Sequence, residues 1–162
     1  MKVFTTRSQT WGRWESLGYD RVLLYTDGAS RGNPGPSATG FILCDEEGHT
    51  LRQGAEFIGE STNNRAEYRA LVKGLEAVLS LTNRCVQCFL DSELLVNQLT
   101  EKYAVRNPEL KKLFRTVKKL EAGFKSITYT HIPRTHKIIM EVDRLVALIL
   151  DKELGRRSED SQ

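Results

Sequence analysis

The sequence has no long apolar run and few cysteines. None of its apolar stretches approaches the ~20 residues that cross a bilayer, so we expect no membrane partner. The first 20 residues lack the apolar core of a signal peptide, so we expect no export signal and a cytoplasmic protein. The three cysteines, Cys44, Cys85 and Cys88, are too few for a disulfide framework, and their odd number agrees with a reducing compartment.

Two of these cysteines have the CxxC spacing that metal-binding and redox sites use. A four-cysteine zinc site would need a fourth thiolate, which the sequence lacks. A redox pair needs a helix N-terminus to lower a thiol pKa, whereas Cys88 leads into the strand-like segment CFLD. We therefore expect these cysteines to fill the core.

The sequence also lacks internal repeats and low-complexity linkers, and 162 residues suit one domain. Its 40% hydrophobic and 28% charged residues are typical of a globular protein. The net charge of +3 is weak evidence for a polyanionic partner. Basic residues gather in one helical segment, and a solvated helix face is the ordinary interpretation of such a cluster. They are Lys111, Lys112, Arg115, Lys118 and Lys119.

The hydrophobic pattern predicts a mixed α/β fold. Predicted strands lie at 21–27, 38–44, 50–59, 85–90 and 124–132, and predicted helices at 61–81, 92–99, 108–122 and 140–154. The opening hairpins indicate antiparallel pairing, and the later strands, separated by helices, indicate parallel pairing. We expect a domain at 21–152, an N-terminal extension at 1–20 of unassigned role, with Trp11 and Trp14, and a flexible tail at 153–162.

Acidic residues lie at the boundaries of these elements. Asp27 closes the first predicted strand, Asp91 follows the fourth, and Asp143 lies early in the last helix, while Glu67 borders the apolar stripe of its helix. Taken singly, each has an ordinary explanation as a turn, cap or surface residue. Together, carboxylates at one rim would repel one another unless cations neutralised them. Oxygen ligands of this kind suit Mg²⁺ or Mn²⁺.

Four segments occur in the order found in type 1 ribonuclease H, and the chain resembles that family from about 21 to 150. The segments are YTDGASRGNPGPSATGF, TNNRAEYRALVKGLEAV, DSELLVNQL and HIPR with EVDRLV. The resemblance implies a ribonuclease H-like fold, a five-stranded mixed sheet with three antiparallel strands, then parallel strands, and helices on both faces. The basic handle that some relatives insert is absent.

The resemblance implies an endoribonuclease that hydrolyses the RNA strand of RNA–DNA hybrids with two Mg²⁺ or Mn²⁺ ions. Its products would carry 5′-phosphate and 3′-hydroxyl ends. By the same resemblance, Asp27 would bridge both ions, Glu67 and Asp91 would help to hold one, and Asp143 the other.

The resemblance also implies a set of substrate contacts. Asn33, Asn63 and Asn64 would lie along the minor groove of the hybrid, and Thr62 and Arg65 would contact phosphates of the DNA strand. One residue of the TNN segment would also cap the following helix. The basic helix at 111–119 would supply part of the DNA-strand contact in place of the missing handle.

The segment before the last acid departs from the family pattern. Ile139 occupies a position where family members commonly have Asn, and Glu141 competes with Asp143 for the role of the fourth acid. His136 has two interpretations, an assistant in proton transfer or product release and a solvated loop residue.

Two other functions remain open. One is a recombination-type DNA nuclease on the same fold, although such enzymes lack the combined GNPG and TNNRAE segments. The other is a non-catalytic or weakly active module that binds hybrid or double-stranded RNA. A monomer is expected in each case.

Overall fold

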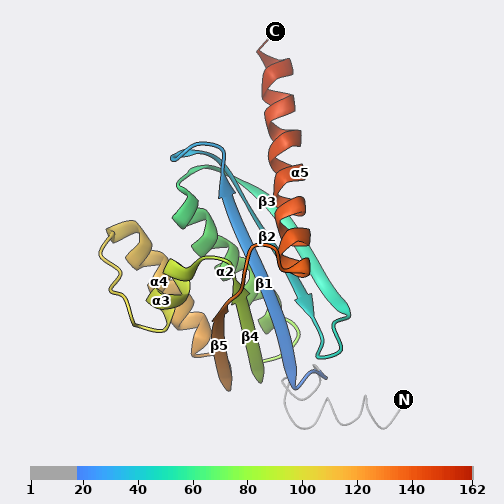
Figure 1. Ribbon diagram of the computed structural model, residues 1–162, viewed down its shortest axis with the longest axis vertical. Coiled ribbons are helices and arrows are strands. Elements are labelled where there is room, and N and C mark those ends of the chain that lie inside the picture. The colour runs from blue at the N-terminus through green and yellow to red at the C-terminus, as the bar shows by residue number, and fades with distance from the viewer. Residues whose placement is uncertain (1–17, 162) are drawn as a thin grey trace.

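The computed structural model describes residues 18–161, and these form one mixed sheet with helices on both faces (Figure 1). The strands are β1 (Arg21–Ser30), β2 (Gly35–Cys44), β3 (Thr50–Ser61), β4 (Cys85–Leu90) and β5 (Ser126–His131). The helices are α2 (Asn63–Leu79), α3 (Glu93–Leu99), α4 (Pro108–Glu121) and α5 (Lys137–Asp160). The predicted order of elements is confirmed. The extension with Trp11 and Trp14 falls largely outside the described residues.

The strand order is β3-β2-β1-β4-β5, which confirms the predicted mixed sheet. The first three strands pair antiparallel, and β4 joins β1 and β5 in parallel. This topology follows from the connections, because two short hairpins can only reverse the chain, whereas helical crossovers return it in the same direction. Within residues 18–161, no helix has the length and apolar character needed to span a bilayer.

The two faces of the sheet carry separate apolar cores. Side chains alternate between the faces along β1, so Leu24 packs with α2, α3 and α4, whereas Tyr25 packs with α5. Cys88 lies within the first core, as the sequence predicts. Cys85 lies three positions earlier on β4, an odd separation that directs the two thiols to opposite faces.

Two structural boundaries differ from those predicted. The pairing of β1 with β2 extends to Ser30, whereas its pairing with β4 ends at Tyr25. Asp27 therefore lies inside β1 and does not end it. α5 begins at Lys137, not Met140, and continues to Asp160 through the segment predicted as a flexible tail. The interpretation of the segment before Asp143 as a loop is therefore wrong beyond His136.

The early start of α5 has a simple physical cause. Ile139, Val142, Val146 and Leu150 are buried and follow the spacing of one helix face, so the apolar stripe already includes Ile139, one residue before the predicted start. His136 provides the N-cap, because its Nδ1 accepts a hydrogen bond of 3.2 Å from the backbone N–H of Ile138.

Two glycines allow both helix layers to approach the centre of the sheet closely. A Cβ atom on Gly28 would lie 2.3 Å from the carbonyl carbon and oxygen of Ala66 in α2. A Cβ atom on Gly40, which pairs with Asp27 across the β1–β2 ladder, would lie 2.8 Å from a methyl group of Val146 in α5. Close contact here sets the distance between the acid on β1 and the helices on each side.

We predict that Gly28→Ala lowers the free energy of unfolding by about 1–3 kcal/mol, because the added methyl group collides with the rigid backbone of α2. Gly155→Ala is the matched control, since nothing lies within 4 Å of its Cβ position in α5. We expect the control to be no less stable than the parent, because alanine favours a helix. Chemical denaturation followed by circular dichroism measures both, and equal stability of the two variants would contradict the predicted collision.

Candidate active site

Three carboxylates meet where β1, α2 and β4 converge. Each of Asp27, Glu67 and Asp91 offers an oxygen, and these oxygens lie within 4.8 Å of one another. The parallel register of β1 and β4 explains the meeting, because Tyr25 pairs with Phe89 and the acids lie two residues further along each strand direction. Residues two apart in a strand share a face, so both acids leave the sheet on the same side. The predicted common rim of these three acids is therefore present.

The site is buried, and burial makes two of its carboxylates, those of Asp27 and Glu67, hard to ionise. Asp27 is 2% exposed and Glu67 is 8% exposed. Burial, followed by the negative charges of the neighbouring acids, raises the pKa of Asp27 to about 8. Burial, followed by the charge of Asp91, raises the pKa of Glu67 to about 7. Both Asp27 oxygens are buried and have no hydrogen-bond partner within the described part of the chain.

This donor set fits a divalent cation. Buried polar atoms are normally hydrogen-bonded, so two orphaned carboxylate oxygens need either a proton or a cation. A group of carboxylate oxygens without nitrogen or sulfur is the environment that Mg²⁺ and Mn²⁺ prefer. Asp27, Glu67 and Asp91 are therefore suitable first ligands for such an ion.

The fourth predicted acid lies apart from this group, on α5. Asp143 is exposed in the second turn of the helix, and its negative charge raises the pKa of Asp27. The charge of its rival, Glu141, instead raises the pKa of Cys44. The charge of Asp143 therefore acts on the acidic group, whereas that of Glu141 acts on a thiol.

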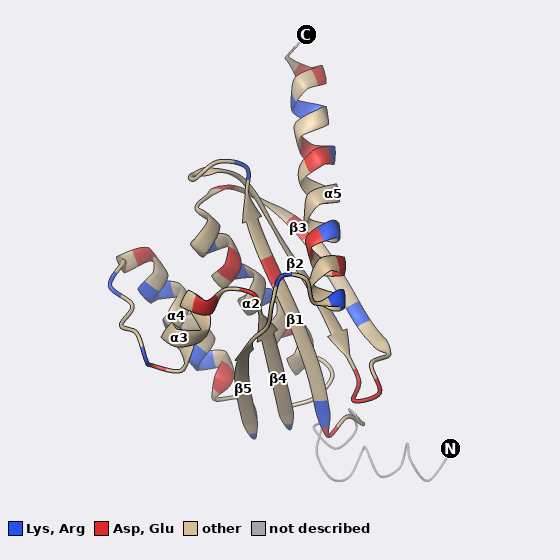
Figure 2. Ribbon diagram, viewed as in Figure 1, with Lys and Arg blue, Asp and Glu red and all other residues tan. Residues whose placement is uncertain are grey.

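One residue at the rim was missed by the sequence analysis. The Arg134 Nε lies 3.2 Å from an Asp91 carboxylate oxygen, and its side chain is 72% exposed while that of Asp91 is 7% exposed. Figure 2 shows this basic segment of the β5–α5 connection close to the acidic segment of β1. A signal was available, because Arg134 lies three residues beyond β5 and Asp91 one residue beyond β4, and the two strands are parallel neighbours.

Most of the predicted substrate-binding residues surround one pocket of about 240 Å³. Asn33, Thr62, Asn64 and Arg65 line it together with the start of α4. Thr62 is the N-cap of α2, and its hydroxyl accepts a hydrogen bond from the Arg65 N–H at 3.3 Å. The fifth residue, Asn63, donates its backbone N–H to the side-chain oxygen of Asn33 at 3.1 Å.

The start of α4 adds residues that were not predicted for this pocket. Asn107 is the N-cap of α4, and Glu109 pairs with Arg65 at 3.7 Å. The predicted basic cluster at 111–119 lies on α4 (Figure 2). Two of its residues have internal partners, because Lys112 pairs with Glu109 and Lys118 with Glu121.

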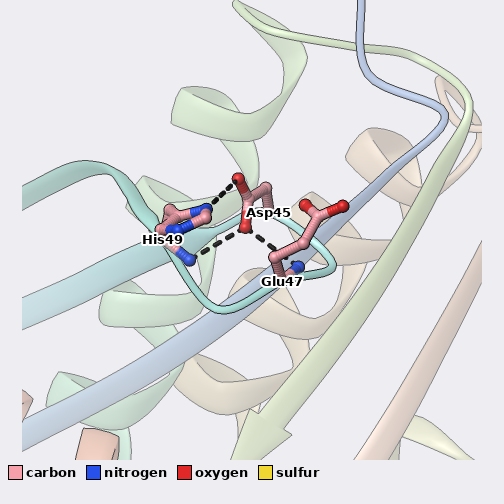
Figure 3. A group of neighbouring side chains, drawn as sticks. All are labelled: Asp45, Glu47 and His49. Carbon is pink, nitrogen blue, oxygen red and sulfur yellow. Dashed lines mark hydrogen bonds and ion pairs between the residues drawn. The ribbon is translucent and has the colours of Figure 1, made fainter.

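A second group of potential ligands lies in the β2–β3 hairpin, where Figure 3 shows Asp45, Glu47 and His49. One Asp45 oxygen accepts the backbone N–H groups of Glu47 at 3.0 Å and His49 at 2.8 Å. The other lies 3.1 Å from Nδ1 of His49. These contacts stabilise the turn, and they explain why the three residues lie together without a bound metal ion.

Comparisons with known proteins agree with this geometry. The family described as reverse transcriptase-like matches residues 25–143. Ribonuclease HI of Halobacterium salinarum is 40% identical over 114 residues, which cover 70% of this chain and 57% of that protein. The chain covers 38% of the length of a bifunctional protein of Mycobacterium tuberculosis, to which it is 35% identical. It thus spans less than two thirds of either relative.

Solved structures show the same fold. The crystal structure of RNase H1 from Halobacterium salinarum superposes with a TM-score of 0.78 and 38% identity, covering 82% of this chain and 98% of that one. LC11-RNase H1 in complex with an RNA/DNA hybrid gives a TM-score of 0.76 and 37% identity, covering 82% and 99%. The motifs, the fold and these matches lead to one conclusion: the chain belongs to the type 1 ribonuclease H family.

Proposed function

We propose that this protein is an endoribonuclease that hydrolyses the RNA strand of RNA–DNA hybrids with two divalent cations. The observation that carries the proposal is the buried Asp27 carboxylate, unpaired and packed against Glu67 and Asp91. Such a group is stable as an anion only with a cation beside it. The relative LC11-RNase H1, solved with an RNA/DNA hybrid, supports the choice of substrate.

The four acids would provide the protein ligands of the two ions. In the proposal the four acids would hold the two ions, with Asp27 shared between them, Glu67 and Asp91 assigned to one and Asp143 to the other. When bound, the ions supply a water of lowered pKa and neutralise the charge that develops on the leaving oxygen. The products then carry 5′-phosphate and 3′-hydroxyl ends.

Other residues orient the nucleic acid. The exposed guanidinium of Arg134, beside Asp91, offers hydrogen bonds to a phosphate at the rim of the site. Thr62 and Arg65, at the N-terminus of α2, form a second phosphate site on the DNA strand, since helix N-termini attract anions. Asn33 lines the same pocket as Thr62 and Arg65 and is suited to contact a sugar, where the 2′-hydroxyl distinguishes RNA from DNA.

We predict metal-dependent cleavage that Asp27→Asn abolishes. An end-labelled hybrid should be cut with Mg²⁺ or Mn²⁺ and stay intact with a chelator. The loss of several kcal/mol of transition-state stabilisation should lower kcat/KM by at least about 10²-fold. Intact RNA in every lane containing metal and parent protein would leave only a binding function.

Two further substrates separate the rival functions. An all-DNA junction tests the recombination-type nuclease, and double-stranded RNA tests the breadth of RNA recognition. Cleavage of the junction without cleavage of the hybrid would overturn the proposal. Dephosphorylation and ligation of the products determine which end carries the phosphate.

We also predict that Asp27→Asn stabilises the metal-free protein at high pH. The pKa of Asp27 rises from 3.8 to about 8 on folding, so the folded state keeps a proton that the unfolded chain has lost between these values. Stability must then fall as the pH rises from about 4 to about 8. The variant escapes this loss and should gain at least about 1 kcal/mol at pH 8, the equivalent of roughly one pKa unit.

Urea denaturation at pH 4, 6 and 8 measures this difference. The stability advantage of Asp27→Asn should be absent at pH 4 and largest at pH 8, and Mg²⁺ should stabilise the parent but not the variant. An advantage that stays constant across this range would contradict the raised pKa.

The second phosphate site gives a separate prediction. Arg65→Ala should raise KM for the hybrid several-fold, leave kcat within about two-fold, and reduce the slope of log affinity against log salt by about one. Arg21→Ala is the matched control, because Arg21 lies at the start of β1, six residues before Asp27, and pairs with Glu46 at 3.4 Å. Equal effects of the two substitutions would exclude a specific contact at Arg65.

A further inference from the structure

Three aromatic rings stack beneath the carboxylates. The ring centroids of Tyr25 and Phe89 are 4.9 Å apart with an interplanar angle of 18°. Those of Tyr25 and His136 are 5.5 Å apart with an angle of 23°. Tyr25 is 6% exposed, and no hydrogen bond of its hydroxyl is found within residues 18–161. The ring of Tyr25 stacks on both aromatic neighbours.

Each ring belongs to an element that carries one of the acids. Tyr25 precedes Asp27 by two residues on β1, so both side chains leave the same face of the sheet. Phe89 stands in the same relation to Asp91, although Asp91 lies just past the end of β4. The two rings are direct partners in the parallel register, and the acids extend beyond them in the same direction.

The third ring links α5 to this pair. His136 is the N-cap of α5, and Asp143 lies seven residues along, which is about two helical turns. Its Nδ1 accepts the N–H of Ile138 at 3.2 Å, so the hydrogen bond and the stack together hold the orientation of the imidazole. A residue that caps the helix and stacks on β1 connects Asp143 to the strand that carries Asp27.

We propose that Phe89, Tyr25 and His136 act as a positioning stack, which aligns the acids of β4, β1 and α5 for joint metal binding. The inference rests on the proposed function and assigns His136 a positioning role instead of proton transfer. Mutual repulsion tends to separate the acids, so their backbones need lateral support close to the site. Flat rings in contact provide it, since they resist sliding of one element along another.

Paired substitutions separate the stack from other roles of the same residues. Tyr25→Phe keeps the ring, whereas Tyr25→Leu removes it. His136→Asn keeps a capping side chain and loses the stack, whereas His136→Phe keeps an aromatic ring and loses the cap. We expect Tyr25→Leu and His136→Asn to lower kcat and raise the Mg²⁺ concentration for half-maximal rate by about 10- to 100-fold, with little change in KM for the hybrid.

The two variants that keep an aromatic ring test whether the ring alone is enough for activity. Tyr25→Phe and His136→Phe should restore most of the rate and most of the metal affinity. If both His136 variants lose activity equally while Tyr25→Leu keeps it, His136 acts by its own chemistry and the positioning stack is overturned.

A measurement without substrate separates this inference from the proposed function. Mg²⁺ should raise the thermal unfolding midpoint of the parent, and Tyr25→Leu should need about 10-fold more Mg²⁺ for the same shift. Phe124→Leu is the control, because Phe124 is buried in the core on the other face of the sheet. It should lower the midpoint and leave the metal dependence unchanged.

The outcomes are distinct. If Tyr25→Leu behaves like Phe124→Leu, with lower stability and unchanged metal dependence, the rings are only core residues and the inference fails. If the parent leaves the hybrid intact while Tyr25→Leu weakens the metal-induced shift, the proposed function fails and the alignment of the acids stands.

Discussion

The close approach of Asp27 and Asp91 is the interaction on which this site depends. The two acids repel each other, and burial makes the charge of Asp27 more costly, as its raised pKa indicates. They stay together because β1 and β4 are adjacent parallel strands with a common apolar core. The register cannot slip by one residue without turning the apolar side chains of both strands toward the wrong face.

The molecule therefore combines a stable scaffold with a locally unfavourable site. Leu24, Leu71 and Val86 are completely or almost completely buried between the sheet and α2, and burial of such side chains provides the free energy that holds the acids in place. Gly28 and Gly40 have no side chain, so α2 and α5 can approach the two faces of the sheet closely. A cation would remove the repulsion, so the proposed metal binding would also stabilise the fold.

The rim of the site is assembled from segments that are distant in the sequence. Arg134 follows β5, yet it pairs with Asp91 after β4. Asn107 caps α4, yet it lines the same pocket as Thr62 on α2. Arg134 and Thr62 belong to the four family segments, whereas Asn107 and Glu109 add to the proposed nucleic-acid surface from outside them, in a chain that connects α3 to α4 without the basic handle.

The sequence by itself determined the order of strands and helices, and it identified Asp27, Glu67 and Asp91, because periodicity, capping and motif spacing are local properties of the chain. The family resemblance also favoured Asp143 over Glu141, and the tertiary structure adds that the charge of Asp143 acts on Asp27 and that Arg134 pairs with Asp91. It also placed His136 as a cap stacked on Tyr25, where the sequence predicted a loop. Such contacts depend on strand register and on the angle at which α5 crosses the sheet, and neither is encoded within a short segment.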